Sequence, residues 1–192
     1  MKITLIQGHP DSEGGHFGNA LADAYARGAR AGGHELRPVE VAGLGFPLLR
    51  SQREFEDGTP PESIEVAQRT IAWSDHLVII YPLWLGSMPA LLKGFLEQVF
   101  RPVFVMQTEP DGGSKRPLKG KSARVIVTMG MPALAYRWFF RAHGLKSLER
   151  NILSFVGIRP MRATLIGGIE SLSPVRRSKW LQRIENLGAR AG

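Results

Sequence analysis

Residues 76–100 read HLVIIYPLWLGSMPALLKGFLEQVF. The first part, Leu77–Ile80, is apolar at every position, which is typical of a strand covered on both faces. After a loop with proline and glycine, apolar residues return at helical spacing, with Pro89 in the first turn and Ser87 as the candidate N-cap. The apolar face of this helix consists of Leu92, Phe95, Leu96, Val99 and Phe100. The stretch therefore predicts a buried strand, a loop and an amphipathic helix.

The same alternation of short β-type and longer helix-type segments runs through the whole chain. Strands of about five residues are expected at 3–6, 35–39, 76–81, 123–129 and 161–166. Helices are expected at about 17–31, 62–73, 89–100, 134–155 and 174–188. Parallel strands need crossover connections, so this order predicts helices on both faces of a parallel sheet. We expect a single α/β domain over residues 1–192, a three-layer sandwich around a five-stranded sheet.

Composition narrows the class of protein and its chemistry. Hydrophobic residues make up 43% and charged residues 22% of the chain, as in a globular protein. The longest apolar stretch, Leu77–Leu85, is too short to span a bilayer, and MKITLIQG lacks the features of a signal peptide, so we expect a cytoplasmic protein. Without cysteines and without paired histidine spacing, we expect no metal site, and any redox activity would need a bound cofactor.

The charge is unevenly distributed along the sequence. Residues 1–112 contain 9 Lys and Arg against 14 Asp and Glu, whereas residues 113–192 contain 16 against 3. A basic half of this kind suits an anionic membrane surface, an acidic partner, a phosphate-bearing ligand or a solvated surface. No helix-turn-helix or base-stacking platform is apparent, so we expect no nucleic acid partner.

Three loops follow predicted strands, at the edge of the sheet where open α/β proteins bind ligands. The glycine-rich loop 8–19 (GHPDSEGGHFGN) suits a phosphate at a helix start, although it is neither GxGxxG nor GxxxxGKS. The loops 81–89 and 128–132 suit the two sides of a flat aromatic ligand, the first through Trp84. Each loop alone also fits a structural turn, but together they point to a flavin mononucleotide moiety.

Two stretches carry a resemblance to a known family. YPLWLGSMPALLKGFLEQVF (81–100) and PLKGKSARVIVTMGMP (117–132) resemble the flavodoxin-like NAD(P)H:quinone oxidoreductases, which include DT-diaphorase, bacterial modulators of drug activity and ancillary subunits of potassium efflux systems. A weaker likeness extends from residue 1 to about 188. The resemblance implies a flavodoxin-like fold, bound flavin (FMN or FAD), NAD(P)H as co-substrate and a quinone or similar small molecule as electron acceptor.

The resemblance also implies roles for individual residues. The flavin phosphate would lie against His9, Phe17 and Gly18, and the isoalloxazine ring would lie between two groups, Pro82, Leu83, Trp84, Leu85 and Thr128, Met129, Gly130, Met131. Backbone N–H groups of 83–85 and 129–131 are expected to stabilise charge on the reduced ring. Tyr136 and His143 would assist charge relay, but His143 is one residue further along than the family pattern, so a surface or packing role stays open.

Three expectations concern assembly and specificity. The apolar helix after residue 89 and the family resemblance predict a homodimer in which the 101–121 connection borders the partner's flavin. The basic cluster Lys115–Arg124 is a candidate site for the phosphates of NAD(P)H. Met106 and Thr108 occupy positions where the family often has an aromatic pair, which leaves the acceptor open.

An alternative function is a regulatory flavoprotein bound to a membrane transport system.

Overall fold

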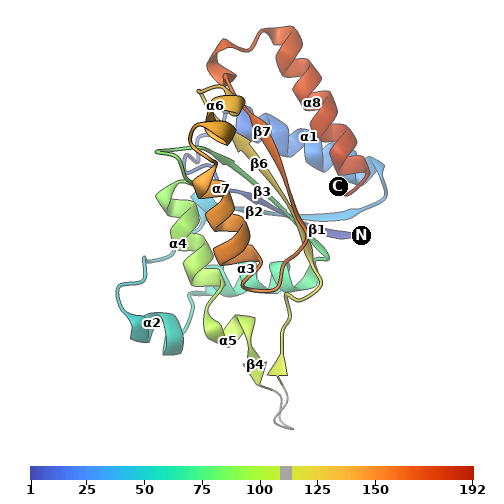
Figure 1. Cartoon of the computed structure of the whole chain (residues 1–192). Helices are drawn as coiled ribbons and strands as arrows, with labels where there is room; N and C mark the ends of the chain where they lie inside the picture. Colours follow the sequence, from blue (N-terminus) through green and yellow to red (C-terminus); the bar gives the residue numbers. More distant parts are fainter. Residues whose placement is uncertain (109–113) are drawn as a thin grey trace.

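The computed structural model describes residues 1–108 and 114–192 and contains a five-stranded parallel sheet (Figure 1). Its strands are β1 (Lys2–Gln7), β2 (Glu35–Glu40), β3 (His76–Pro82), β6 (Ser122–Thr128) and β7 (Met161–Ile166). The strand order is β2-β1-β3-β6-β7, and all four neighbouring pairs are parallel. Because every strand points the same way, their carboxyl ends share one edge. This order is the flavodoxin-like one, so the predicted fold is confirmed.

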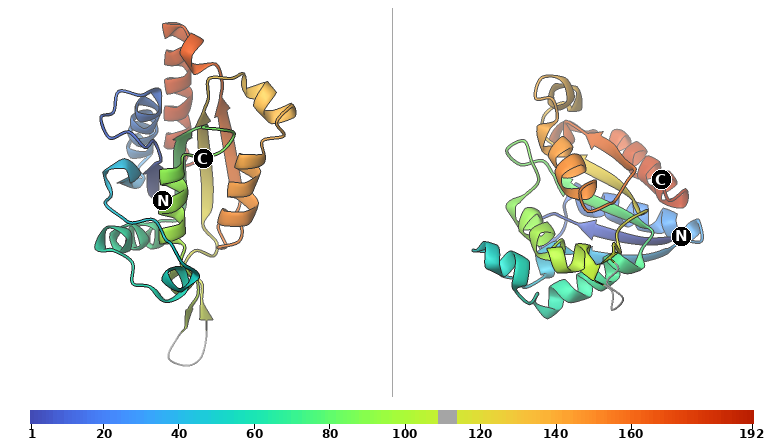
Figure 2. Two further views of the ribbon diagram at one scale, coloured as in Figure 1. Left: turned by 90° about the vertical axis from the view of Figure 1, so that its left-hand side faces the viewer. Right: turned by 60° about the horizontal axis from the view of Figure 1, so that its bottom comes forward.

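Helices cover both faces of the sheet, as Figure 2 shows. On one face lie α1 (Phe17–Ala31) and α8 (Pro174–Ala189), and on the other lie α3 (Glu62–Trp73) and α4 (Ala90–Val99). The shorter elements are η1 (Val41–Gly43), α2 (Gln52–Asp57), α5 (Pro102–Val105), β4 (Gln107–Thr108), β5 (Ser114–Lys115), α6 (Ala133–Trp138), α7 (His143–Ser147), η2 (Leu148–Leu153) and η3 (Ile169–Ser171).

Two apolar cores result from the alternation of side chains along the central strands. On β3, Val78 and Ile80 pack toward α1 and α8, whereas Leu77, Ile79 and Tyr81 pack toward α3 and α4. All five side chains are buried, which explains the uninterrupted apolar run in the sequence.

The α1–α8 pair is unusually close because glycines lie at its crossing. A Cβ atom built on Gly28 would lie 1.9 Å from the carbonyl oxygen of Glu185, and one built on Gly188 would lie 2.2 Å from that of Tyr25. Both distances are far shorter than a carbon–oxygen contact allows. Each helix therefore needs glycine where the other helix's backbone crosses it.

The prediction of one helix over 134–155 is wrong. Helix α6 ends at Trp138, and the chain turns through Arg141 and Ala142, which have φ angles of 53° and 49° in the left-handed region. The N–H of Ala142 donates to the carbonyl oxygen of Tyr136 at 3.0 Å, which closes the turn before α7. The apolar pattern therefore continues from α6 into α7, and no glycine or proline marks the junction between them.

Ser87 is not the N-cap of α4, contrary to expectation. The cap is Pro89, which has no side-chain hydrogen bond to the helix. Ser87 lies earlier, where its N–H and carbonyl groups close a tight turn with Trp84.

The connection 101–121 is more ordered than the irregular loop that was predicted. It contains α5 and the antiparallel pair β4–β5, while Pro110, Gly112 and Gly113 lie outside the described residues. Its first residue, Arg101, donates from Nη1 to the carbonyl oxygens of Glu54 (2.8 Å) and Gly58 (2.6 Å).

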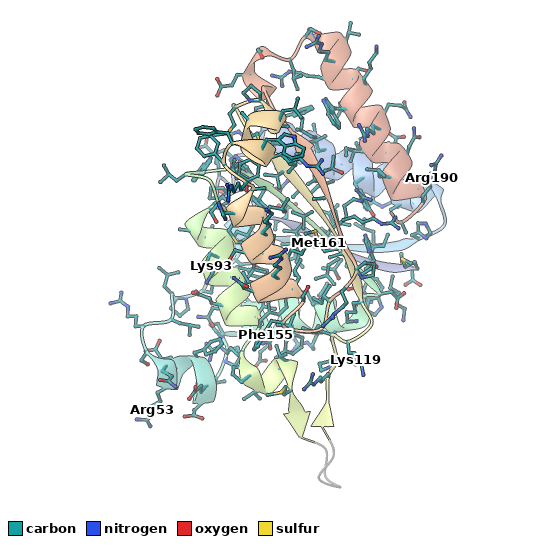
Figure 3. All side chains as sticks on the ribbon, in the orientation of Figure 1. Arg53, Lys93, Lys119, Phe155, Met161 and Arg190 are labelled. Atoms are coloured by element: carbon teal, nitrogen blue, oxygen red, sulfur yellow. The ribbon has the colours of Figure 1, made fainter. Side chains whose placement is uncertain are left out.

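The basic cluster Lys115–Arg124 overlaps the end of this connection, and its part from Lys119 onward lies at the amino end of β6, away from the carboxyl edge, as the position of Lys119 in Figure 3 shows. Lys121 donates from Nζ to the carbonyl oxygens of Ala72 (2.8 Å) and Ser74, and Arg124 is buried beside Thr164. Lys121 and Arg124 are therefore used within the protein, and contact of the rest of this cluster with the phosphates of NAD(P)H stays a prediction.

The apolar face of α4 is buried within the subunit itself, since its five large side chains are each at most 7% exposed. This face therefore gives no argument for a dimer, and the homodimer stays a prediction from the family resemblance. Within the described ranges, no helix combines the length and hydrophobicity needed to cross a membrane.

Candidate flavin site

The three predicted ligand loops meet at the carboxyl edge of the sheet. They leave the adjacent strands β1, β3 and β6. The N–H of Gly8 donates to the carbonyl oxygen of Ile80 at 2.7 Å, and the N–H of Leu83 donates to that of Thr128 at 2.7 Å. The loop after β1 is thus tied to β3, and the loop after β3 is tied to β6.

The first loop is organised around two histidines. The rings of His9 and His16 stack with centroids 3.9 Å apart. Asp11 links them, because its N–H donates to Nδ1 of His9 at 3.1 Å and its Oδ2 lies 2.7 Å from Nε2 of His16. Burial, followed by the neighbouring His16, lowers the pKa of His9. Since Nδ1 of His9 accepts a hydrogen bond, the neutral ring carries its proton on Nε2 and can donate it to a ligand.

The glycines of the first loop have two roles. Two of them leave free space beside the loop, and one allows close packing. Gly14 and Gly15 have φ angles of 77° and 78°, and no atom lies within 4 Å of a Cβ built on either. In contrast, a Cβ on Gly8 would lie 2.6 Å from a methyl carbon of Leu92 on α4. The loop therefore reaches the sheet tightly at one end and leaves free space beside the start of α1.

The start of α1 carries unused polar groups. Its N-cap, His16, makes no side-chain cap hydrogen bond. Nε2 of Gln7 and Oδ1 of Asn19 are buried without a hydrogen-bond partner among the residues that the structure describes. Free N–H groups at a helix start favour an anion.

A cation that the sequence reasoning missed lies beside Phe17 at the same helix start. The guanidinium of Arg177, from α8, lies 5.2 Å from the ring centroid of Phe17. Its Nη2 donates to the carbonyl oxygen of Ile169 at 2.8 Å, which fixes it near the carboxyl edge. In the sequence Arg177 is one of three arginines in α8, so nothing singled it out.

The second loop presents a large apolar surface on a strained turn. Trp84 and Ser87 exchange two backbone hydrogen bonds of 2.9 Å around Leu85 and Gly86, whose φ angles are 46° and 79°. Two consecutive left-handed residues form a type I′ turn, which costs ~1 kcal/mol or more at a non-glycine residue such as Leu85. The side chain of Leu85 is fully exposed and that of Trp84 is 51% exposed. The fold thus holds two large apolar side chains in solvent at the carboxyl edge.

The third loop is pinned on one side and open on the other. The N–H of Met129 donates to the carbonyl oxygen of Ile166 at 2.9 Å, and the carbonyl oxygen of Met131 accepts from Gly168 at 3.1 Å. Thr128 and Met129 are buried, whereas Gly130 is exposed.

The loops differ in which backbone donors they leave available. The N–H groups of Leu83, Trp84 and Met129 donate within the protein, so they are not free to stabilise charge on a reduced ring; contacts of these residues with a flavin stay predictions. Over residues 1–108 and 114–192, the N–H groups of Leu85, Gly130 and Met131 have no hydrogen-bond partner. These three can donate to the polar edge of a ring.

The sequence reasoning also missed a carboxylate, Glu170, which follows β7. A Cβ built on Gly130 would lie 3.4 Å from Oε1 of Glu170, so this carboxylate borders the third loop. The loop after β7 belongs to the same sheet edge as the other three, and this position was the available signal.

The two predicted relay residues differ in environment. Tyr136 is buried, its hydroxyl donates to the carbonyl oxygen of Gly86 at 3.4 Å, and it accepts from the N–H of Leu145 at 3.1 Å. Burial raises the pKa of Tyr136. His143 is exposed at the start of α7, with no hydrogen-bond partner for its ring within the described part of the chain. Tyr136 thus holds the strained turn through its hydrogen bond to Gly86. The catalytic roles of Tyr136 and His143 stay predictions.

Comparisons with known proteins identify the family of this chain. A family model described as flavodoxin-like fold matches residues 1–187. A relative from Haemophilus influenzae, named an uncharacterized NAD(P)H oxidoreductase, is 27% identical over 186 residues, which cover 95% of this chain and 91% of the relative. NAD(P)H dehydrogenase (quinone) 1 of Cavia porcellus is 30% identical over 215 residues, covering 97% of this chain and 77% of the relative.

Two further likenesses bear on regulation and on the fold. The glutathione-regulated potassium-efflux system ancillary protein KefG of Salmonella newport is 28% identical over 163 residues, covering 85% of this chain and 73% of the relative. The solved structure of an FMN-dependent NADH-azoreductase from Bacillus anthracis in complex with FMN has a TM-score of 0.72 at 16% identity, over 99% of this chain and 98% of that chain. From the matched family model and these relatives, we conclude that this chain belongs to the flavodoxin-like NAD(P)H:quinone oxidoreductases.

Proposed function

We propose that the protein binds a flavin across the three loops and transfers hydride from NAD(P)H through it to a quinone or a similar two-electron acceptor. The observation that carries the proposal is the junction of the loops at one edge, tied by the Gly8–Ile80 and Leu83–Thr128 hydrogen bonds. A phosphate cradle, an exposed apolar turn and free backbone donors are thereby brought together. These are the features that a flavin's phosphate, ring face and ring edge require.

The residues present fit the phosphate end of a flavin. The unpartnered donor Nε2 of Gln7, the open space beside Gly14 and the stacked His9 all lie around the start of α1. Arg177 adds a positive charge there. Helix N–H groups and a cation would hold the phosphate, and His9 would donate to it from Nε2.

The residues of the other two loops fit the ring. Trp84 and Leu85 would cover apolar ring surface and exclude water, and the N–H groups of Leu85, Gly130 and Met131 would hold the polar edge. A bound flavin supplies hydride acceptance and two-electron transfer, while the protein orients the reactants. Oriented N–H dipoles favour the negative charge of the reduced ring.

Tyr136 and His143 would have different roles in this proposal. Because burial raises the pKa of Tyr136, its phenol stays protonated at neutral pH and keeps its hydrogen bond to Gly86. His143 lies exposed on the adjacent turn. Tyr136 therefore fixes the turn that covers the ring, and His143 supplies or removes the proton.

A second candidate function is regulation of a membrane transport system by the flavin-loaded protein. The likeness to KefG favours it, and it uses the same flavin site. Co-purification with an integral membrane protein would support this role. Turnover with quinones at the rate of flavin reduction would instead make catalysis the main role.

The proposed reaction is tested in two steps. The purified protein is first freed of flavin and titrated with FMN and with FAD, followed by flavin fluorescence. The loaded protein is then mixed with NADH or NADPH without oxygen, and the flavin absorbance is followed before and after a quinone is added. We expect stoichiometric binding, bleaching by the nicotinamide nucleotide and recovery by the quinone. Absence of flavin binding, or of bleaching by both nucleotides, would contradict the proposal.

A further inference from the structure

A separate cavity of about 930 Å³ lies beside the outer edge strand β7. It is bordered by α6 and α7 on one side and by α8 on the other. Ala133 and Leu134, at the start of α6, belong to its wall and directly follow the third ligand loop. The cavity is therefore continuous in sequence with the candidate flavin site, but it is not one of the three loops.

The charge of this cavity is strongly positive. Its wall includes four cationic side chains, Arg137, Arg141, Lys146 and Arg183, against one carboxylate, Glu149. All four are exposed. In residues 1–108 and 114–192, none of the four forms an ion pair or a side-chain hydrogen bond. Cations at the amino edge, such as Lys121, are by contrast bonded to the protein's own carbonyl groups. These four are thus available to an anionic ligand.

Aromatic surface accompanies the charge. Trp138 and Trp180 line the same cavity, and the side chain of Trp138 is 74% exposed. The guanidinium of Arg183 lies 5.1 Å from the ring centroid of Trp180. Indole and guanidinium planes stack on nucleotide bases, and arginine binds phosphates with paired hydrogen bonds. The combination selects an aromatic phosphate ester over a simple anion.

The position of the cavity suits one end of a long ligand. Helix α6 rises about 1.5 Å per residue, so Trp138 lies roughly 8 Å along the helix from Ala133, which adjoins the third loop. A molecule with one ring over the flavin can therefore extend along α6 and place its other end among the arginines.

We propose that this cavity binds the phosphorylated adenosine end of NADPH while its nicotinamide lies over the flavin. The inference rests on the proposed function and deepens it, because it assigns a binding site to the adenosine end of the nucleotide and predicts discrimination between NADPH and NADH. The 2′-phosphate that distinguishes NADPH from NADH would bind Arg137 and Arg183, and the adenine would stack on Trp138. The basic part of the sequence thereby acquires a ligand at the carboxyl side of the molecule.

The direct test uses adenosine 2′,5′-bisphosphate as probe, titrated by calorimetry into the flavin-loaded wild type and into Arg137→Gln/Arg183→Gln. Loss of two charge-assisted contacts should weaken the probe's binding by at least about tenfold. The matched control, Arg50→Gln/Arg53→Gln, has the same change of charge on and just before α2, where Figure 3 shows Arg53 far from α8, and should bind within about twofold of wild type. Trp138→Ala should weaken binding several-fold through lost stacking.

Several outcomes would overturn the proposal. These are no binding of the probe to wild type, equal loss in the control pair, or inorganic phosphate binding as tightly as the probe. Flavin reduction should slow for NADPH relative to NADH in Arg137→Gln/Arg183→Gln, whereas reoxidation of dithionite-reduced protein by a quinone should not change. If the protein binds no flavin, the proposed function fails, but the same titration of the flavin-free wild type and Arg137→Gln/Arg183→Gln still decides whether the cavity is a nucleotide site.

Discussion

The two edges of the sheet use polar groups in opposite ways. At the amino edge, Lys121 is satisfied by the carbonyl groups of Ala72 and Ser74, and His76 lies 2.7 Å from the hydroxyl of Ser122. At the carboxyl edge, Leu85 is held in a left-handed conformation with its side chain in solvent, and the Gly130 N–H has no partner within the described ranges. At the first edge these groups bond to the protein itself, whereas the second leaves a donor and apolar surface exposed, as the proposed ligand site requires. A density of cationic residues in the sequence therefore does not by itself locate a site.

The largest effect is expected from pH at the amino edge. Burial, with the nearby Arg124 and Arg162, lowers the pKa of His76 to about 4. Because the folded pKa is below the unfolded value, the unfolded chain binds more protons between these values, and stability falls as pH falls through that window. The loss should reach roughly 3 kcal/mol at pH 4 relative to pH 7. Urea unfolding of wild type and His76→Gln at both pH values measures it.

The control for this experiment is His143→Gln, at the exposed start of α7. It should follow the wild-type pH dependence, while His76→Gln should lose less stability on acidification. Identical pH dependence in all three proteins would show that His76 is not a buried neutral histidine.

A smaller loss of stability is expected from Lys121→Met. The substitution leaves the carbonyl oxygens of Ala72 and Ser74 without their donor, which should cost about 2 kcal/mol of unfolding free energy. Flavin affinity should stay within about twofold, because the residue lies at the opposite edge. The exposed Lys119→Met is the control and should change neither quantity. A large loss of flavin affinity in Lys121→Met would break the separation of the two edges.

At the carboxyl edge, Trp84→Ala should weaken flavin binding about tenfold, which corresponds to ~1.4 kcal/mol of lost apolar contact. The free energy of unfolding of the flavin-free protein should change little, since Trp84 is half exposed. The matched control is Trp73→Ala on α3, where the guanidinium of Arg37 lies 4.0 Å from the ring centroid. That variant should act on stability alone. Unchanged flavin affinity in Trp84→Ala would remove the second loop from the site.

The smallest expected effect comes from a change at Leu85, and it tests the difference between the two edges most directly. Leu85→Gly removes the left-handed strain and should stabilise the flavin-free protein by ~0.5–1 kcal/mol, while flavin affinity falls through lost contact. In the same variant, chemical unfolding measures the gain in stability and flavin titration measures the loss of affinity. Destabilisation of the flavin-free protein would show that Leu85 packs for stability and is not strained for a ligand.

The hydrophobic pattern was sufficient for the fold because strand–helix alternation and the apolar run of β3 follow from burial on both sheet faces. The break between α6 and α7 escaped prediction, since the left-handed Arg141 and Ala142 have no glycine or asparagine to signal it. Their conformation is imposed by tertiary contacts, including the buried Tyr136 hydroxyl.

The candidate site was predictable in position but not in detail. Strand ends located the three loops, and glycines marked the first. The available donors could not be predicted, because whether the N–H of Trp84 is free depends on its partner Ser87 across the turn. Glu170 and Arg177 reach the edge from distant parts of the sequence, through β7 and α8.

The glycine crossing of α1 and α8 also has a consequence for the order in which the molecule is made. Helix α1 ends at Ala31 and α8 begins at Pro174, so a ribosome releases the two halves of this contact far apart in synthesis. Until α8 emerges, the apolar face of α1 has no cover, and the phosphate cradle at its start has no Arg177. Chains generally fold as units during synthesis, so we expect the nascent chain to acquire flavin only after its last helix has docked.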